Sequence, residues 1–303
     1  MVFSEQTGRG SRSPGTGSRH GRRALVAAVL AGLLAGCAAP PLSDAPVPDR
    51  PAAEILSGCC TGDLPYPDWL IRLADANVEP IRAVGKIQFR PGRMTRQPEL
   101  AALLESELRP LDMLFFHSDN RVSGHLLPGQ FTHGAVYVGS EAKLRAAGLW
   151  DLPALRPWQG HIRGGAVYLE AVDGGVRLSP PGIVLDTDAV VALRPRGIDR
   201  AVSLRRGLAQ MGVPFDMHFD AGDRSQLFCA ELIALMLPEA ELPRTPVHGR
   251  VTILPDAVVA GVLTRDLPFQ LVGYVEATPG GGARVQPPQL LAWHIRRAWP
   301  GAR

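Results

Sequence analysis

The 303-residue sequence has few cysteines, very little lysine and no apolar run long enough to cross a membrane, which needs about 20 residues. Lysine occurs only at positions 86 and 143, so arginine supplies nearly all of the positive charge. The formal net charge of +3 arises at the N-terminus, because residues 1–36 hold five arginines and one glutamate; the remainder has 27 basic and 28 acidic residues. A near-neutral domain lacks the basic surface that binds nucleic acid, so we exclude nucleic acid as a partner.

The longest apolar run, residues 24–36 (ALVAAVLAGLLAG), follows Arg22 and Arg23 and ends directly before Cys37. A basic start, a short apolar run and small residues at its end indicate a signal peptide over residues 1–36. Leu-Ala-Gly-Cys resembles the lipobox of bacterial lipoproteins, which implies that Cys37 is acylated, with palmitate-type chains, and becomes the mature N-terminus. Two or more acyl chains anchor a protein stably. We therefore expect a lipid-anchored protein of the cell envelope, on the periplasmic face of the outer membrane, with the membrane as a partner.

Residues 38–65 are rich in proline, alanine and glycine and predict a flexible tether after Cys37, and residues 66–303 then form one domain. The adjacent Cys59 and Cys60 either form a vicinal disulfide, pair between chains or stay reduced. Cys229 stands alone in the domain, and no cysteine spacing indicates a zinc cage. We expect neither a metal nor a cofactor.

Hydrophobic patterning predicts strands separated by turn signals, together with several helices. The strands are expected at 112–116, 132–139, 166–172, 189–193 and 270–276. The helices are expected within 67–77 and 98–108 and over 200–211, 225–237 and 289–299. Because the strands precede the apolar helix 225–237, the pattern favours an α+β fold with an antiparallel sheet.

Three residues of this pattern have side chains suited to nucleophilic catalysis. Cys229 lies near the start of a predicted helix, where the dipole and unpaired N–H groups lower the pKa of a thiol. His133 shares a strand face with Tyr137 and is a candidate base. Glu170 lies inside an apolar strand, where a carboxylate needs a partner. Each also has a plain structural interpretation: a small buried residue for Cys229, a structural histidine for His133 and a solvent-facing carboxylate for Glu170.

In their order along the chain, these residues match a known pattern. It comprises LRPLDMLFF (108–116), FTHGAVYVG (131–139), LEA (169–171), PFDMHF (214–219), FCAELI (228–233) and ILPD (253–256). This order resembles the circularly permuted NlpC/P60-like cysteine hydrolases, the YiiX/YebB-like group, in which the histidine strand precedes the cysteine helix. Leu111, where the family often has glycine, and Ala230, where it often has serine, depart from the pattern.

The resemblance implies a papain-like fold in which a central antiparallel sheet packs against the cysteine-bearing helix. It implies a catalytic set of Cys229, His133 and Glu170. We add Tyr137, Asp112 and Phe131 as candidate substrate-binding residues and expect residues 140–165 to form an insertion near the site.

The expected activity is thiol-dependent hydrolysis of an amide or ester acyl bond, with cell-wall peptides as one substrate class. Two alternatives stay open. One is a lipid acylhydrolase or acyltransferase of the lecithin–retinol acyltransferase type, acting on an acyl substrate. The other is a non-catalytic lipoprotein that uses the same fold as a binding module.

Overall fold

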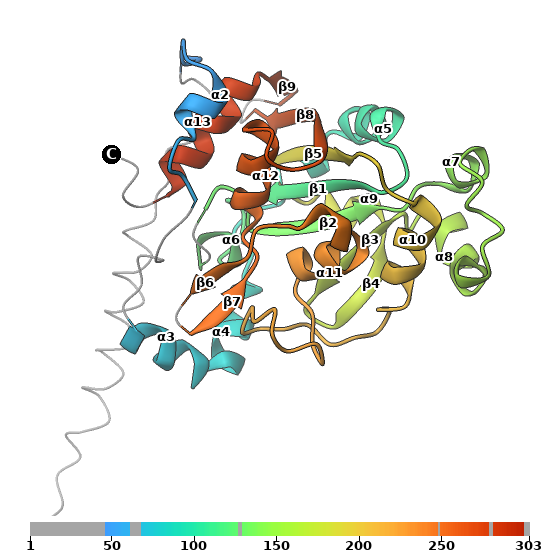
Figure 1. The fold of residues 1–303 in the computed structure, drawn as a ribbon, viewed down its shortest axis with the longest axis horizontal. Helices are drawn as coiled ribbons and strands as arrows, with labels where there is room; N and C mark the ends of the chain where they lie inside the picture. The colour runs from blue at the N-terminus through green and yellow to red at the C-terminus, as the bar shows by residue number, and fades with distance from the viewer. Residues whose placement is uncertain (1–45, 61–67, 127–128, 248, 279–280, 300–303) are drawn as a thin grey trace, which may run out of the picture. The chain divides into compact units, whose positions relative to one another are not determined.

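The computed structural model describes residues 46–60, 68–126, 129–247, 249–278 and 281–299 (Figure 1). Cys37 and the predicted signal peptide lie outside these ranges. Within them, no helix has the length and apolar character needed to span a bilayer.

The centre of the described domain is a seven-stranded sheet in the order β4-β3-β2-β1-β5-β8-β9, in which every neighbouring pair is antiparallel. The strands are β1 Asp112–His117, β2 His133–Tyr137, β3 Tyr168–Val172, β4 Gly175–Ser179, β5 Ala189–Pro195, β8 Phe269–Ala277 and β9 Ala283–Gln286. A separate hairpin pairs β6 Thr245–Val247 with β7 Arg250–Thr252. The predicted α+β class with a large antiparallel sheet is confirmed.

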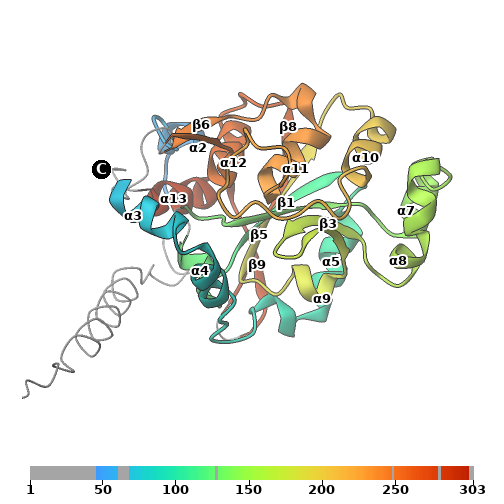
Figure 2. The ribbon, with the colours of Figure 1, turned by 90° about the horizontal axis from the view of Figure 1, so that it is seen from below.

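Helices lie on both sides of this sheet. Figure 2 shows α10, α11 and α12 on one side and α5 and α9 on the other. The α-helices are α2 Ala52–Ile55, α3 Asp68–Asp75, α4 Val78–Gly85, α5 Pro98–Glu107, α6 Ser123–Leu126, α7 Glu141–Ala146, α8 Gln159–Arg163, α9 Pro181–Val184, α10 Arg200–Leu208, α11 Cys229–Met236, α12 Pro255–Leu263 and α13 Pro288–Ala298. Three 3-10 helices are η1 Met94–Arg96, η2 Pro153–Trp158 and η3 Pro238–Ala240.

All five predicted strands are present, with boundaries shifted by at most a few residues. The strands β4 and β9 were not predicted. β4 follows the turn at Gly174 and exposes Arg177, and β9 is an edge strand whose side chains are mostly exposed, so neither shows a run of apolar residues. Alternation is a weak signal in strands this short.

The helix predicted over 225–237 begins later, at Cys229, with Phe228 as its N-cap. The residues before it are held extended, because Phe215 pairs with Leu227 in a parallel bridge and Leu227 donates to the carbonyl of Pro214. Cys229 is therefore the first helical residue. The helix packs against β2, β3 and α10.

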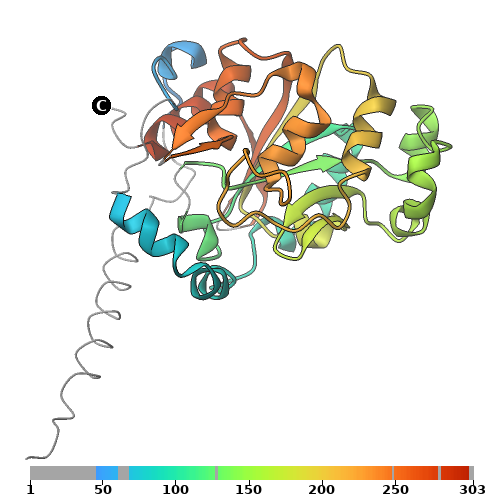
Figure 3. The same cartoon turned by 60° about the horizontal axis from the view of Figure 1, so that its bottom comes forward.

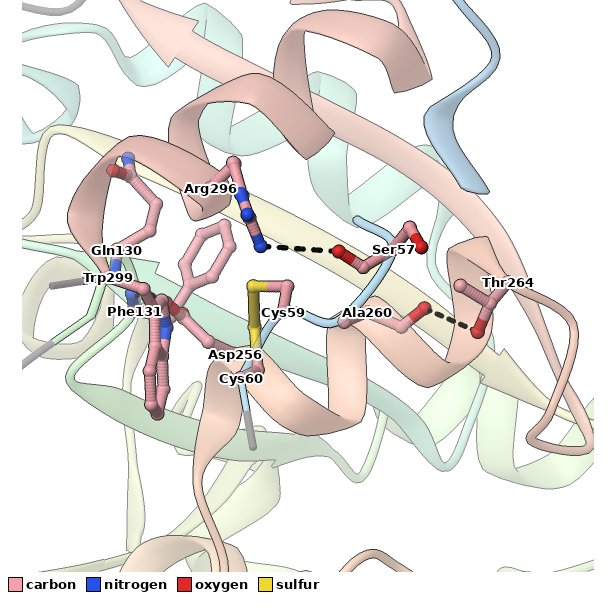
Figure 4. Close-up of a disulfide and its surroundings, with 10 residues drawn as sticks. All are labelled: Ser57, Cys59, Cys60, Gln130, Phe131, Asp256, Ala260, Thr264, Arg296 and Trp299. Carbon is pink, nitrogen blue, oxygen red and sulfur yellow. Dashed lines mark hydrogen bonds between the residues drawn. A yellow bond between two sulfur atoms is a disulfide. The ribbon is translucent and has the colours of Figure 1, made fainter. Parts of the chain in front are cut away.

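The structure differs from the prediction of a flexible tether over residues 52–60. Helix α2 contacts α12 and α13, and Leu56 and Cys60 are buried in the core. Cys59 and Cys60 form a vicinal disulfide, which settles the three alternatives for this pair (Figure 4). The folded domain therefore begins before residue 66.

The expected position of residues 140–165 near the site is also wrong. This segment follows Tyr137 at the end of β2, whereas His133 is the first residue of that strand. Figures 1 and 3 show α7 and α8, in light green, well away from α11. The segment is held there by Lys143, which donates to the carbonyls of Glu105 and Leu108.

Gly134 allows α11 to lie close to β2. A Cβ atom at this position would lie 3.0 Å from the ring of Phe115 and 3.3 Å from Cδ1 of Ile233 in α11. Both neighbours are buried and cannot move freely.

We predict that Gly134→Ala lowers the free energy of unfolding by about 1–3 kcal/mol, because an added methyl group overpacks this contact. Urea denaturation followed by circular dichroism measures the change. Gly160→Ala is the matched control, since nothing lies within 4 Å of its Cβ position. An equal effect of the two substitutions would contradict the prediction.

Candidate active site

Glu170 and His133 form the centre of the site. His133 Nε2 lies 2.9 Å from Glu170 Oε2 across the β2–β3 pairing, in which Ala135 is opposite Glu170. The carboxylate is almost fully buried, whereas the imidazole is 27% exposed. The histidine side chain can therefore be reached from solvent while its partner cannot.

Strand β4 supplies further donors to this carboxylate. Ser179 Oγ donates to Glu170 Oε1 at 2.6 Å, and the Arg177 guanidinium donates to the same oxygen at 3.3 Å. The β3–β4 register places Arg177 directly opposite Glu170 and Ser179 opposite Tyr168. The side chains of Glu170, Arg177 and Ser179 therefore lie on the same face of the sheet. Sequence reasoning missed Ser179 and Arg177, although the turn at Gly174 would have fixed their register.

These contacts shift the two titrations in opposite directions. Burial alone would raise the pKa of Glu170, but hydrogen bonds from His133 and Ser179 and the charges of His133 and Arg177 lower it to about 2. Burial alone would lower the pKa of His133, but interactions with Cys229 and Glu170 raise it to about 10. At neutral pH the pair is thus a carboxylate and an imidazolium.

Cys229 is the second neighbour of the His133 ring, and its interaction with the ring helps to raise the pKa of His133. Because Glu170 engages Nε2, Nδ1 is the ring nitrogen that can face the sulfur. Cys229 is 5% exposed and is the first residue of α11. The N-cap residue Phe228 has no side-chain acceptor, so it leaves the N–H groups of the first turn to other partners. The structure therefore brings the three predicted catalytic residues together.

Glu231, two residues after Cys229, is a buried carboxyl of the FCAELI motif to which no role was assigned. It is 2% exposed, and its Oε2 atom has no hydrogen-bond partner among the described residues. Burial and the nearby Asp216 carboxylate raise its pKa to about 7, although a hydrogen bond from the Phe228 backbone opposes the shift. Glu231 is the third residue after the N-cap Phe228, which is the spacing of the carboxylate in a capping box.

Two of the predicted substrate-binding residues lie elsewhere. Tyr137 is the last residue of β2, whereas His133 is the first. It is fully buried against the ring of Tyr168, and Asp112 on β1 pairs with it. The Asp112 carboxylate is 1% exposed and is bound by the guanidinium of Arg194, at 2.6 and 2.9 Å. Both side chains stabilise the sheet at its other end, so their predicted role is wrong.

Phe131 precedes His133 by two residues but is also a core residue. It is 1% exposed, and its ring contacts Tyr274 edge-on. Phe115 and Phe116 are equally buried, and Phe116 stacks on the His133 ring. These aromatic side chains therefore do not form a surface for an acyl chain.

No group of three or more His, Cys, Asp or Glu side chains in the described ranges is arranged to hold a metal ion. The evenly spaced histidines 117, 125 and 133 have separate surroundings. His117 contacts the carbonyl of Gln130, His125 contacts the ring of Phe89, and His133 contacts Glu170.

No protein-family model, curated protein or solved structure shows a significant match to this chain. The functional interpretation therefore rests on the motif order and on the geometry of the site.

The opposite pKa shifts predict how the pair contributes to stability as pH changes. The depressed pKa of Glu170 gives a contribution that is present above pH 4.5 and is lost as the pH falls toward 2. The raised pKa of His133 gives one that is present below pH 6.5 and is lost as the pH rises toward 10.

We predict that Glu170→Gln costs about 3 kcal/mol near pH 5–6 and progressively less outside that window. Thermal unfolding of both proteins from pH 3 to 10 measures the difference. Glu239→Gln serves as a control because Glu239 forms an exposed ion pair with Arg206, which contributes little. A difference independent of pH would refute the prediction.

Proposed function

We propose that the chain is a thiol-dependent hydrolase that cleaves an amide or ester acyl bond, with Cys229 as nucleophile, His133 as acid–base and Glu170 as the residue that orients it. The observation that supports this most directly is the interaction of one imidazole with both a thiol at a helix start and a buried carboxylate. This set matches the logic of a nucleophile, a base and an orienting group.

The proposed reaction begins when His133 takes the proton of the Cys229 thiol, which leaves a thiolate beside an imidazolium. The sulfur attacks the acyl carbon, and the Cys229 N–H at the start of α11 donates to the developing oxyanion. His133 gives its proton to the leaving amine or alcohol, which departs and leaves a thioester. Water then loses a proton to His133 and attacks the thioester, which releases the acid and the thiolate.

The order of the motifs and the N-terminal sequence support a fold and a location for the proposed enzyme. We propose a papain-like domain of the permuted NlpC/P60-like group, because the histidine strand precedes the cysteine helix. We place it in the cell envelope, anchored through Cys37, with cell-wall peptides as substrates. The Cys59–Cys60 disulfide supports an exported protein, since such bonds persist in oxidising compartments. Phe115, Phe116 and Phe131 are buried, so these apolar side chains lend no support to a lipid substrate.

Alkylation by iodoacetamide tests the catalytic assignment. We expect the full-length protein to be labelled at Cys229, Cys229→Ala to lose that label, and His133→Ala to react at least about tenfold more slowly at pH 7. Peptide mass spectrometry assigns the labelled residue. His161→Ala, which changes an exposed histidine beside Trp158, should react like the wild type.

Equal, slow labelling of the wild type and of His133→Ala would show that the imidazole does not activate the thiol. That result would leave only a non-catalytic binding module on this fold.

The proposed anchor is tested separately by metabolic labelling with radioactive palmitate in a bacterial host. We expect the wild type to incorporate the label and to sediment with the membrane, and Cys37→Ala to do neither, because Cys37 is the proposed acylation site. Cys229→Ala controls for thioester labelling elsewhere. Palmitate incorporation into Cys37→Ala would contradict the assignment.

A further inference from the structure

The short segment before β2 is held at successive backbone groups. The N–H of Gln130 donates to Asp256 Oδ2 at 2.7 Å, and the N–H of Phe131 donates to Asp256 Oδ1 at 2.9 Å. The N–H of Thr132 then donates to the carbonyl of Phe116 at 3.1 Å. His133 is the next residue, so its backbone position follows from these bonds.

Asp256 reaches this segment from the start of α12, where it is the second helical residue. It is 1% exposed and accepts a third hydrogen bond, from Trp299 Nε1 at 2.8 Å. Figure 4 shows Asp256 between Gln130, Phe131 and Trp299. The positive end of the helix dipole favours a carboxylate here. Burial nevertheless raises its pKa to about 6, although the three donors favour the charged form.

Gly129 shows how closely the carboxylate approaches the chain. Its φ is +113°, and a Cβ at this position would lie 2.8 Å from Asp256 Oδ2. Only glycine combines that backbone conformation with that contact without strain.

The same segment is held from the other side by His117 at the end of β1. Its Nδ1 lies 2.6 Å from the carbonyl oxygen of Gln130, and its Nε2 lies 3.1 Å from Asp119 Oδ1. Burial opposes protonation of His117, but Asp119 and the Gln130 carbonyl outweigh it, so its pKa is raised. The His117 ring contacts the carbonyl through Nδ1, while Asp256 accepts from the N–H groups.

We propose that Asp256 and His117 are positioning residues of the active site, which hold residues 130–132 so that the His133 ring contacts Cys229 and Glu170 at once. This inference rests on the proposed function. Asp256 and His117 are buried, and their partners are Trp299, Asp119 and the backbone of residues 130–131, so they act through the backbone. Errors of about 1 Å in the placement of a catalytic group can cost about 100-fold in rate. The clamp that Asp256 and His117 form around residues 130–132 can therefore affect the reaction rate strongly.

Asp256→Asn tests the clamp. The amide keeps one acceptor oxygen but turns an NH₂ group toward the second N–H, so one of the two backbone bonds is lost. We expect alkylation of Cys229 by iodoacetamide at pH 7 to slow by about 10- to 100-fold. We also expect the NMR titration of the His133 ring, near pH 10 in the wild type, to move toward 6.5. A purely structural role would leave that titration unchanged.

Asp112→Asn is the matched control, because Asp112 is an equally buried carboxylate that accepts from Arg194 at the other end of the sheet. It should lower the melting temperature without changing the alkylation rate or the His133 titration. If Asp256→Asn behaves in the same way, the clamp has no role in positioning and the inference is overturned.

A second pair of variants keeps the test decisive if Asp256→Asn does not fold. His117→Gln retains a donor for the Gln130 carbonyl, whereas His117→Leu has none. We expect the leucine variant to slow alkylation and lower the His133 titration, and the glutamine variant to recover both in part. Wild-type values in both would overturn the inference. Failure of the proposed function is recognised differently, by equal labelling of the wild type and His133→Ala.

Discussion

The contact between His133 and the buried carboxylate of Glu170 is the interaction on which the site depends. A buried carboxylate is costly unless it is paired, and Glu170 accepts a hydrogen bond from Ser179 and forms ion pairs with Arg177 and His133. All of these donors come from the ordered pairing of β2, β3 and β4. A slip of one residue in either pairing would turn Glu170 to the opposite face, so strand register and site geometry are specified together.

The cysteine reaches this pair because of where α11 begins. The extended residues before the helix are held by the bridge between Phe215 and Leu227, which prevents an earlier start. A helix that starts at the sulfur directs its dipole and N–H groups toward it. The proposed nucleophile and its proposed base therefore belong to elements that pack on each other.

Much of this arrangement could be predicted from the sequence, and the failures have physical causes. The apolar strands were predicted because burial leaves a local signal, whereas Cys229, His133 and Glu170 were selected because their order along the chain resembles that of the permuted NlpC/P60-like group. Asp112 and Tyr137 were misplaced because a polar group in a strand has the same pattern whether it meets substrate or, as here, Arg194 and the core. Asp256 lies in the matched ILPD motif but received no role, and Ser179 was missed, because their partners are backbone groups and side chains distant in the sequence.

The folding of residues 52–60 onto α12 and α13 has a consequence for any protein held at Cys37. A fully extended tether from residue 37 to the predicted start of the domain at residue 66 would span about 100 Å. A tether that ends at Ala52 would span only about 50 Å. The docking of residues 52–60 would thus halve the distance that the domain can reach from an anchor at Cys37.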